Sequence, residues 1–67
     1  MQNELLMKRE HLRKEVRILI DRFMKETDKE ESRKIVESIR ANSKEIEAIN
    51  SKLAYIELMQ KLKRNES

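Results

Sequence analysis

A chain of 67 residues forms one small domain at most, and a domain of this size buries little apolar surface by itself. It contains no cysteine, glycine or proline and one histidine, which excludes a disulfide scaffold and argues against zinc sites, sheets and tight hairpin turns. Its 16 basic and 13 acidic residues are interleaved, so the net charge of +3 indicates a solvated helical surface more than a nucleic-acid footprint.

A first amphipathic helix is predicted from about residue 3 to about residue 25, because apolar residues recur there at helical spacing. One stripe carries Leu5, Leu12, Val16, Leu19 and Phe23, with Leu6 and Ile20 on its flank. Such a stripe requires a neighbouring helix to cover it.

The first helix also carries a basic row of Arg9, Arg13 and Arg17, each four residues from the next. The row could contact phosphates, as in hairpin dimers of the repressor-of-primer type, whose architecture this chain resembles. Glu10 and Glu15 interrupt it, and no aromatic side chain is placed to stack a base. Binding of RNA or DNA is therefore an alternative and not the main expectation.

A turn is predicted at about residues 26–28, where the apolar pattern stops and later resumes with its heptad phase shifted by two residues. Two pairs there have the spacing of a helix-capping box, Thr27 with Glu30 and Asp28 with Glu31. Both pairs favour a new helix that begins near residue 28.

The second predicted helix runs from about residue 28 to about residue 64 and is followed by a frayed tail. Residues spaced alternately four and three apart form a coiled-coil seam: Ile35, Ile39, Asn42, Ile46, Ile49, Leu53, Ile56 and Gln60. This pattern requires another helix along the second half of the chain.

Asn42 interrupts this seam and has two interpretations. A buried amide at a core position sets the register of a helix pair, because it needs a partner and penalises wrong pairings. Alternatively Asn42 marks a helix boundary or a solvent-reached edge, since Asn42 and Glu45 also have capping spacing. A chain with three helices therefore stays open beside the hairpin. One long bent helix also stays open, because without glycine the turn near residue 26 lacks the usual left-handed cap.

The predicted fold is an all-α antiparallel helical hairpin, a two-helix coiled coil with unequal arms, that dimerises into a four-helix bundle. Tyr55 stands off the seam, in line with Ala41, Ala48 and Leu62 at seven-residue intervals, and Leu58 and Met59 widen the apolar surface around it. The residues predicted at a partner or dimer interface are Ile46, Ile49, Leu53, Tyr55, Ile56, Met59 and Leu62.

The segment Ser43-Lys44-Glu45-Ile46-Glu47 resembles the Ser-Gln-Glu-Leu-Asp signature of small aspartyl-phosphate phosphatases that restrain sporulation phosphorelays. These are two-helix hairpins, and the resemblance implies a phosphatase-like regulator with Glu47 at the position of their functional Asp. Lys44 replaces their Gln, and the stretch between the helices is longer and lacks their glycine. The overall plan is equally similar to co-chaperones that hold type III secretion needle subunits.

The main functional expectation is a non-enzymatic interaction module, a regulator, adaptor or co-chaperone that binds itself and another protein through helix packing. No cofactor, metal or catalytic residue is expected, since His11 has no companion ligand and two packed helices rarely enclose a pocket. No segment has the length of a signal-peptide core or a membrane span, so a soluble cytoplasmic protein is expected.

Overall fold

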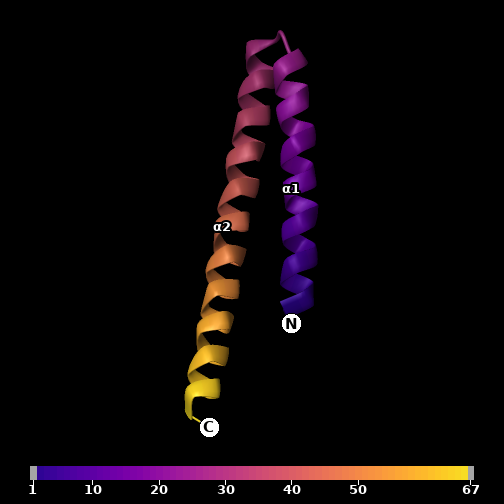
Figure 1. The fold of residues 1–67 in the computed structure, drawn as a ribbon. Coiled ribbons are helices and arrows are strands. Elements are labelled where there is room, and N and C mark those ends of the chain that lie inside the picture. The colour runs from indigo at the N-terminus through magenta and orange to yellow at the C-terminus, as the bar shows by residue number, and fades with distance from the viewer. Residues whose placement is uncertain (1, 67) are drawn as a thin grey trace.

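The computed structural model describes residues 2–66, and for Glu66 the backbone alone. Two helices, α1 (Gln2–Lys25) and α2 (Lys29–Glu66), lie antiparallel and form an extended hairpin of 59 × 15 × 14 Å (Figure 1). The predicted all-α hairpin is thus confirmed. α2 is continuous through Asn42 and Ser43, so the three-helix alternative does not hold. The break at residues 26–28 excludes a single long helix.

The turn between the helices consists of Glu26, Thr27 and Asp28. Oε1 of Glu26 accepts hydrogen bonds from the backbone N–H groups of Thr27, over 3.2 Å, and Asp28, over 3.1 Å. Within residues 2–66 no residue adopts a positive φ. The side chain of Glu26 therefore stabilises a turn that lacks the usual left-handed glycine.

Asp28 is the residue that caps α2. Its Oδ1 accepts a hydrogen bond from the backbone N–H of Glu30 over 2.9 Å, and its carbonyl accepts one from Ser32 over 2.9 Å. Of the two predicted capping pairs, the one that begins with Asp28 lies at the helix start. Its carboxylate partner Glu31 instead pairs with Lys34, Oε1 to Nζ, over 3.6 Å.

The contact between the helices follows a seam on each. Leu12, Ile35 and Ile49 are buried, with 5–6% of their surfaces exposed. On α1 the buried and half-buried positions recur at spacings of four and three: Leu5, Arg9, Leu12, Val16 and Leu19. On α2 the matching positions are Ser32, Ile35, Ile39, Asn42, Ile46, Ile49, Leu53 and Ile56. The predicted seam of α2 thus faces α1 and becomes exposed at Gln60.

Three apolar residues of α1 are more exposed than their predicted places suggest. Phe23 and Leu6 are each 41% exposed and Ile20 is 44% exposed. Leu6 and Ile20 lie on the flank of the stripe, and Phe23 lies in the last turns of α1, where the chain leaves the helix. A hairpin of two helices covers only one face of each, so the flanks stay open to solvent.

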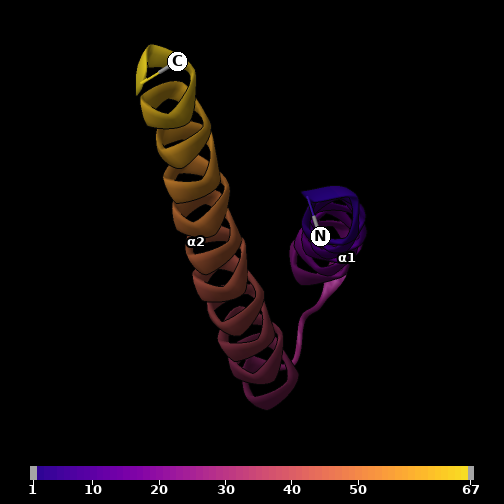
Figure 2. The ribbon, with the colours of Figure 1, turned by 90° about the horizontal axis from the view of Figure 1, so that it is seen from below.

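The two helices separate toward the open end of the hairpin, opposite the turn. Seen from below, α1 is nearly end-on while α2 leans away from it toward the C-terminus (Figure 2). α2 has 38 residues and α1 has 24. At 1.5 Å per residue, α2 therefore extends about 20 Å further than α1. It stays helical to Glu66, beyond the expected fraying near residue 64. Lys63 and Arg64 in its last turn stabilise this end, because positive side chains interact favourably with the negative end of the helix dipole.

Candidate interaction surface

The C-terminal part of α2 carries a group of exposed apolar side chains, here called the overhang surface: Tyr55, Leu58, Met59 and Leu62. Their exposed fractions are 64%, 53%, 47% and 49%. They gather on one side of α2 because positions three, four and seven residues apart lie on one helix face. An exposed apolar group of this kind is typical of a binding surface.

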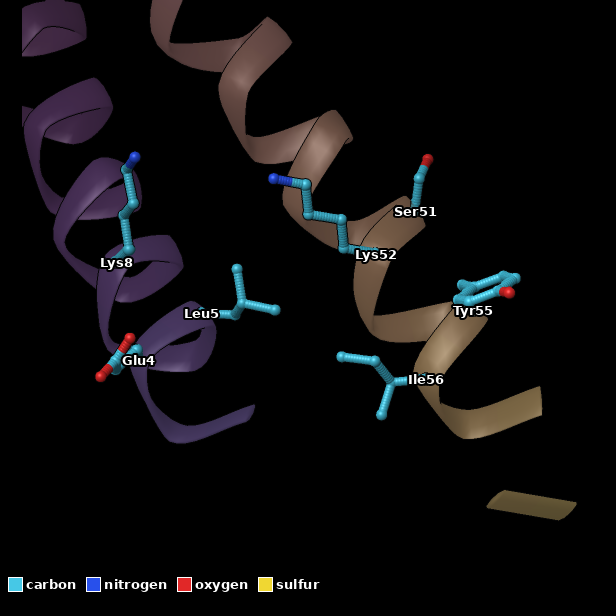
Figure 3. A pocket seen from close by; sticks show the side chains of 7 residues that line it. All are labelled: Glu4, Leu5, Lys8, Ser51, Lys52, Tyr55 and Ile56. Atoms are coloured by element: carbon cyan, nitrogen blue, oxygen red, sulfur yellow. The ribbon is translucent and has the colours of Figure 1, made fainter. Parts of the chain in front are cut away.

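Two shallow grooves, each with a volume of about 580 Å³, adjoin the overhang surface. The first lies between the open ends of α1 and α2 and is lined by Glu4, Leu5, Lys8, Ser51, Lys52, Tyr55 and Ile56 (Figure 3). The second follows α2 and is lined by Tyr55, Ile56, Met59, Gln60, Leu62 and Lys63. Tyr55 and Ile56 line both grooves, so the two grooves adjoin at these residues.

The close-up shows how the first groove is built. Leu5 of α1 and Ile56 of α2 point toward one another, and Tyr55 lies on the side of α2 away from α1 (Figure 3). Leu5 and Ile56 are half-buried. The groove therefore continues the apolar contact of the hairpin out to the surface, with Lys8 and Lys52 at its rim.

The structure separates the predicted interface residues into two sets. Ile49 is buried against α1, and Ile46, Leu53 and Ile56 are half-buried on the same face. They hold the hairpin together. Tyr55, Met59 and Leu62 are exposed and available to another molecule, together with Leu58. Periodicity alone did not divide the two sets, because both faces of α2 are apolar in this region.

Polar residues also connect the helices across the seam. Nη1 of Arg9 donates a hydrogen bond to Oδ1 of Asn50 over 2.8 Å. Nδ2 of Asn42 donates one to Oε2 of Glu15 over 3.3 Å. Asn42 is half-buried, and Glu15 is its partner across the hairpin. A register-setting amide requires such a partner.

Sequence reasoning placed Arg9 in the basic row and missed its second role. The signal was present, because Arg9 stands four residues after Leu5 and three before Leu12, which is the spacing of the α1 seam. Arg9 is half-buried, whereas Arg13 and Arg17 are exposed. The predicted phosphate-contacting row therefore has one member engaged inside the hairpin and two that face solvent.

The remaining titratable candidates lie on the surface. His11 Nε2 is 3.4 Å from Glu15 Oε1, one turn along α1, and Glu47 is exposed on α2. Within residues 2–66, no three His, Cys, Asp or Glu side chains are grouped as a metal site requires. Neither of the two helices, over their described residues, has both the length and the apolar character needed to cross a membrane.

The overhang surface and its grooves are thus the best-formed candidate site, and what they offer is apolar contact bordered by lysines. No family model, curated protein or solved structure matches this chain.

Proposed function

We propose that this protein is a small non-enzymatic interaction module, a regulator, adaptor or co-chaperone, that acts by helix packing and self-association. The observation that carries the proposal is the overhang surface. Four large apolar side chains about half exposed to water lie together beside an apolar groove. Full burial of a large apolar side chain contributes roughly 1.5–3 kcal/mol, so covering the exposed half of each contributes about half of that.

The shape of the hairpin supports self-association. A short α1 leaves part of α2 uncovered, and a chain of this size gains stability when another helix covers such a part. Two hairpins that cover each other would form a four-helix bundle, the assembly expected from the sequence. The same apolar surface also suits a helix of another protein, which binds in a groove by the same contacts.

Sedimentation equilibrium over a concentration series tests this function, with helicity followed by circular dichroism. We expect the wild type to associate, and Tyr55→Glu to dissociate it while helicity is retained, because the charge would be buried in the interface. Ile18→Glu is a matched control, since Ile18 is 61% exposed and lies on α1 outside the overhang surface. A monomer at every concentration, or equal dissociation by both variants, would contradict the proposal.

Two other functions suggested by the sequence remain as rivals. A phosphatase-like regulator would use Glu47, so Glu47→Ala would abolish dephosphorylation of an aspartyl-phosphate protein while the helices stay intact. A nucleic-acid binder would use Arg13 and Arg17. Arg13→Gln/Arg17→Gln would then weaken binding and make the slope of log affinity against log salt concentration shallower by about two. Arg9 is engaged with Asn50, which takes one guanidinium group away from that role.

A further inference from the structure

We propose that the overhang surface is covered by α2 of a second copy of this chain, antiparallel to the first, with the two Tyr55 side chains at the twofold axis. This inference rests on the proposed function and names the partner and its register. A twofold interface is self-complementary, so each feature on one side of Tyr55 must fit a feature on the other side. Both the sizes and the charges along α2 meet this requirement.

The first requirement is met by side-chain size. Ala48, Tyr55 and Leu62 stand at seven-residue intervals on one face of α2, and all three are exposed. Antiparallel pairing centred on Tyr55 places the small Ala48 opposite Leu62 of the second copy. Ser51 and Met59 of the second copy then lie at the same level, on opposite flanks of the contact. A large side chain then meets a small one at the level of Ala48 and Leu62, as close packing requires, whereas parallel pairing would place Leu62 against Leu62.

The second requirement is met by charge. Glu45 and Glu47 precede Tyr55, and Lys61 and Lys63 follow it. All four side chains are exposed, and none forms an ion pair with another of the residues described in the structure. Glu45 and Glu47 on one side of Tyr55, and Lys61 and Lys63 on the other, are therefore without an ion-pair partner inside the described part of the hairpin.

Helix geometry brings these charges together in the proposed dimer. At about 100° per residue, Glu45 and Lys63 both lie about 80° from Tyr55 on one flank, and Glu47 and Lys61 lie about 80° and 120° away on the other. In an antiparallel pair, each flank of one helix faces the same flank of the other helix. Glu45 then lies beside Lys63 of the second copy, and Glu47 beside Lys61 of the second copy. Each pair is offset by about 3 Å along the axis, which a lysine side chain spans. Parallel pairing would set like charges against each other.

The proposed partner lies on the side of α2 away from α1, where Tyr55 points (Figure 3). It therefore leaves the contact between α1 and α2 of each hairpin intact. It removes exposed parts of Tyr55, Leu58, Met59 and Leu62 from water in both copies.

Disulfide trapping tests the register, because the chain has no cysteine and each introduced thiol is unique. Ala48→Cys and Leu62→Cys chains are prepared separately, mixed and oxidised. We expect the mixed disulfide to form faster than either symmetric one, since the antiparallel register places these two positions together. Met24→Cys is the control for random collision, because Met24 is 79% exposed and lies near the turn. Predominance of the symmetric Ala48→Cys product would overturn the inference in favour of a parallel dimer.

Charge reversal gives a second readout that leaves the apolar contact unchanged. Glu45→Lys/Glu47→Lys and Lys61→Glu/Lys63→Glu should each weaken the homodimer by roughly tenfold or more, since four ion pairs become repulsive. An equimolar mixture of the two variants, and a chain that carries all four substitutions, should both regain wild-type affinity. A four-substituted chain that stays as weak as its parents would overturn the antiparallel arrangement.

The two proposals fail in distinguishable ways. A dimer that Tyr55→Glu dissociates, but that gives symmetric crosslinks and no charge rescue, would leave the interaction module in place and overturn the antiparallel register. A wild type that is monomeric at every concentration would overturn both.

Discussion

Arg9 on α1 donates a hydrogen bond through Nη1 to Oδ1 of Asn50 on α2 over 2.8 Å, across 41 residues of sequence. The guanidinium group thus connects the two helices from within the seam of α1, whose other positions from Leu5 to Leu19 are apolar. Along α1, this contact lies between the buried Leu12 and the groove that Leu5 lines. It is one of the two side-chain hydrogen bonds between the described parts of α1 and α2.

Removing either side chain of this pair should destabilise the hairpin. We expect Arg9→Ala and Asn50→Ala each to lower the free energy of unfolding by about 0.5–1.5 kcal/mol, because a hydrogen bond is lost at a partly solvated site. Urea unfolding followed by circular dichroism, at one fixed protein concentration, measures the change. In the double variant the losses should be less than additive; additive losses would show that the two side chains do not interact in solution.

Asn42 is expected to lower the stability of the hairpin and to fix the register of its helices. Asn42→Leu is expected to raise the thermal midpoint, because leucine at a seam position packs against α1, and to populate additional association states, because the amide bonded to Glu15 is gone. Thermal circular dichroism and sedimentation velocity measure the two effects. Glu15→Gln keeps an acceptor for the amide and serves as the control. A single association state for Asn42→Leu would contradict the register-setting role.

The cap of α2 should depend on Asp28 and not on Thr27. Asp28→Ala removes the acceptor of the Glu30 backbone N–H and is expected to cost about 1 kcal/mol. Thr27→Ala, at the neighbouring turn position, should change the unfolding free energy by less than about 0.5 kcal/mol. Urea unfolding of the two variants distinguishes them, and an equal cost would mean that the capping residue is wrongly assigned.

Ile49 should be among the costliest positions to truncate. It is 5% exposed on the face of α2 that contacts α1, so Ile49→Ala is expected to lose roughly 2–4 kcal/mol through lost burial and the cavity left behind. Ile18→Ala offers a control of the same chemistry at a position that is 61% exposed, with an expected loss below about 1 kcal/mol. Similar losses at the two sites, measured by thermal or urea unfolding, would contradict the observed core.

Much of the fold could be predicted from the sequence, because its signals are local. Helical spacing, the lapse of the pattern near residue 26 and the capping chemistry of Asp28 each depend on residues within one or two turns. They predicted two helices, their approximate bounds and the face of α2 that carries Ile35 and Ile49. The absence of glycine and proline in the sequence excluded most other architectures.

The tertiary structure decided what depends on where one helix lies against the other. It placed Arg9 in the seam opposite Asn50, paired Asn42 with Glu15, and kept α2 continuous where a break had been an alternative. It also divided the apolar residues of α2 into those that α1 covers, such as Ile56, and those that stay exposed, such as Tyr55. Neighbouring residues on a helix point about 100° apart, so only the position of the second helix determines which of them is buried.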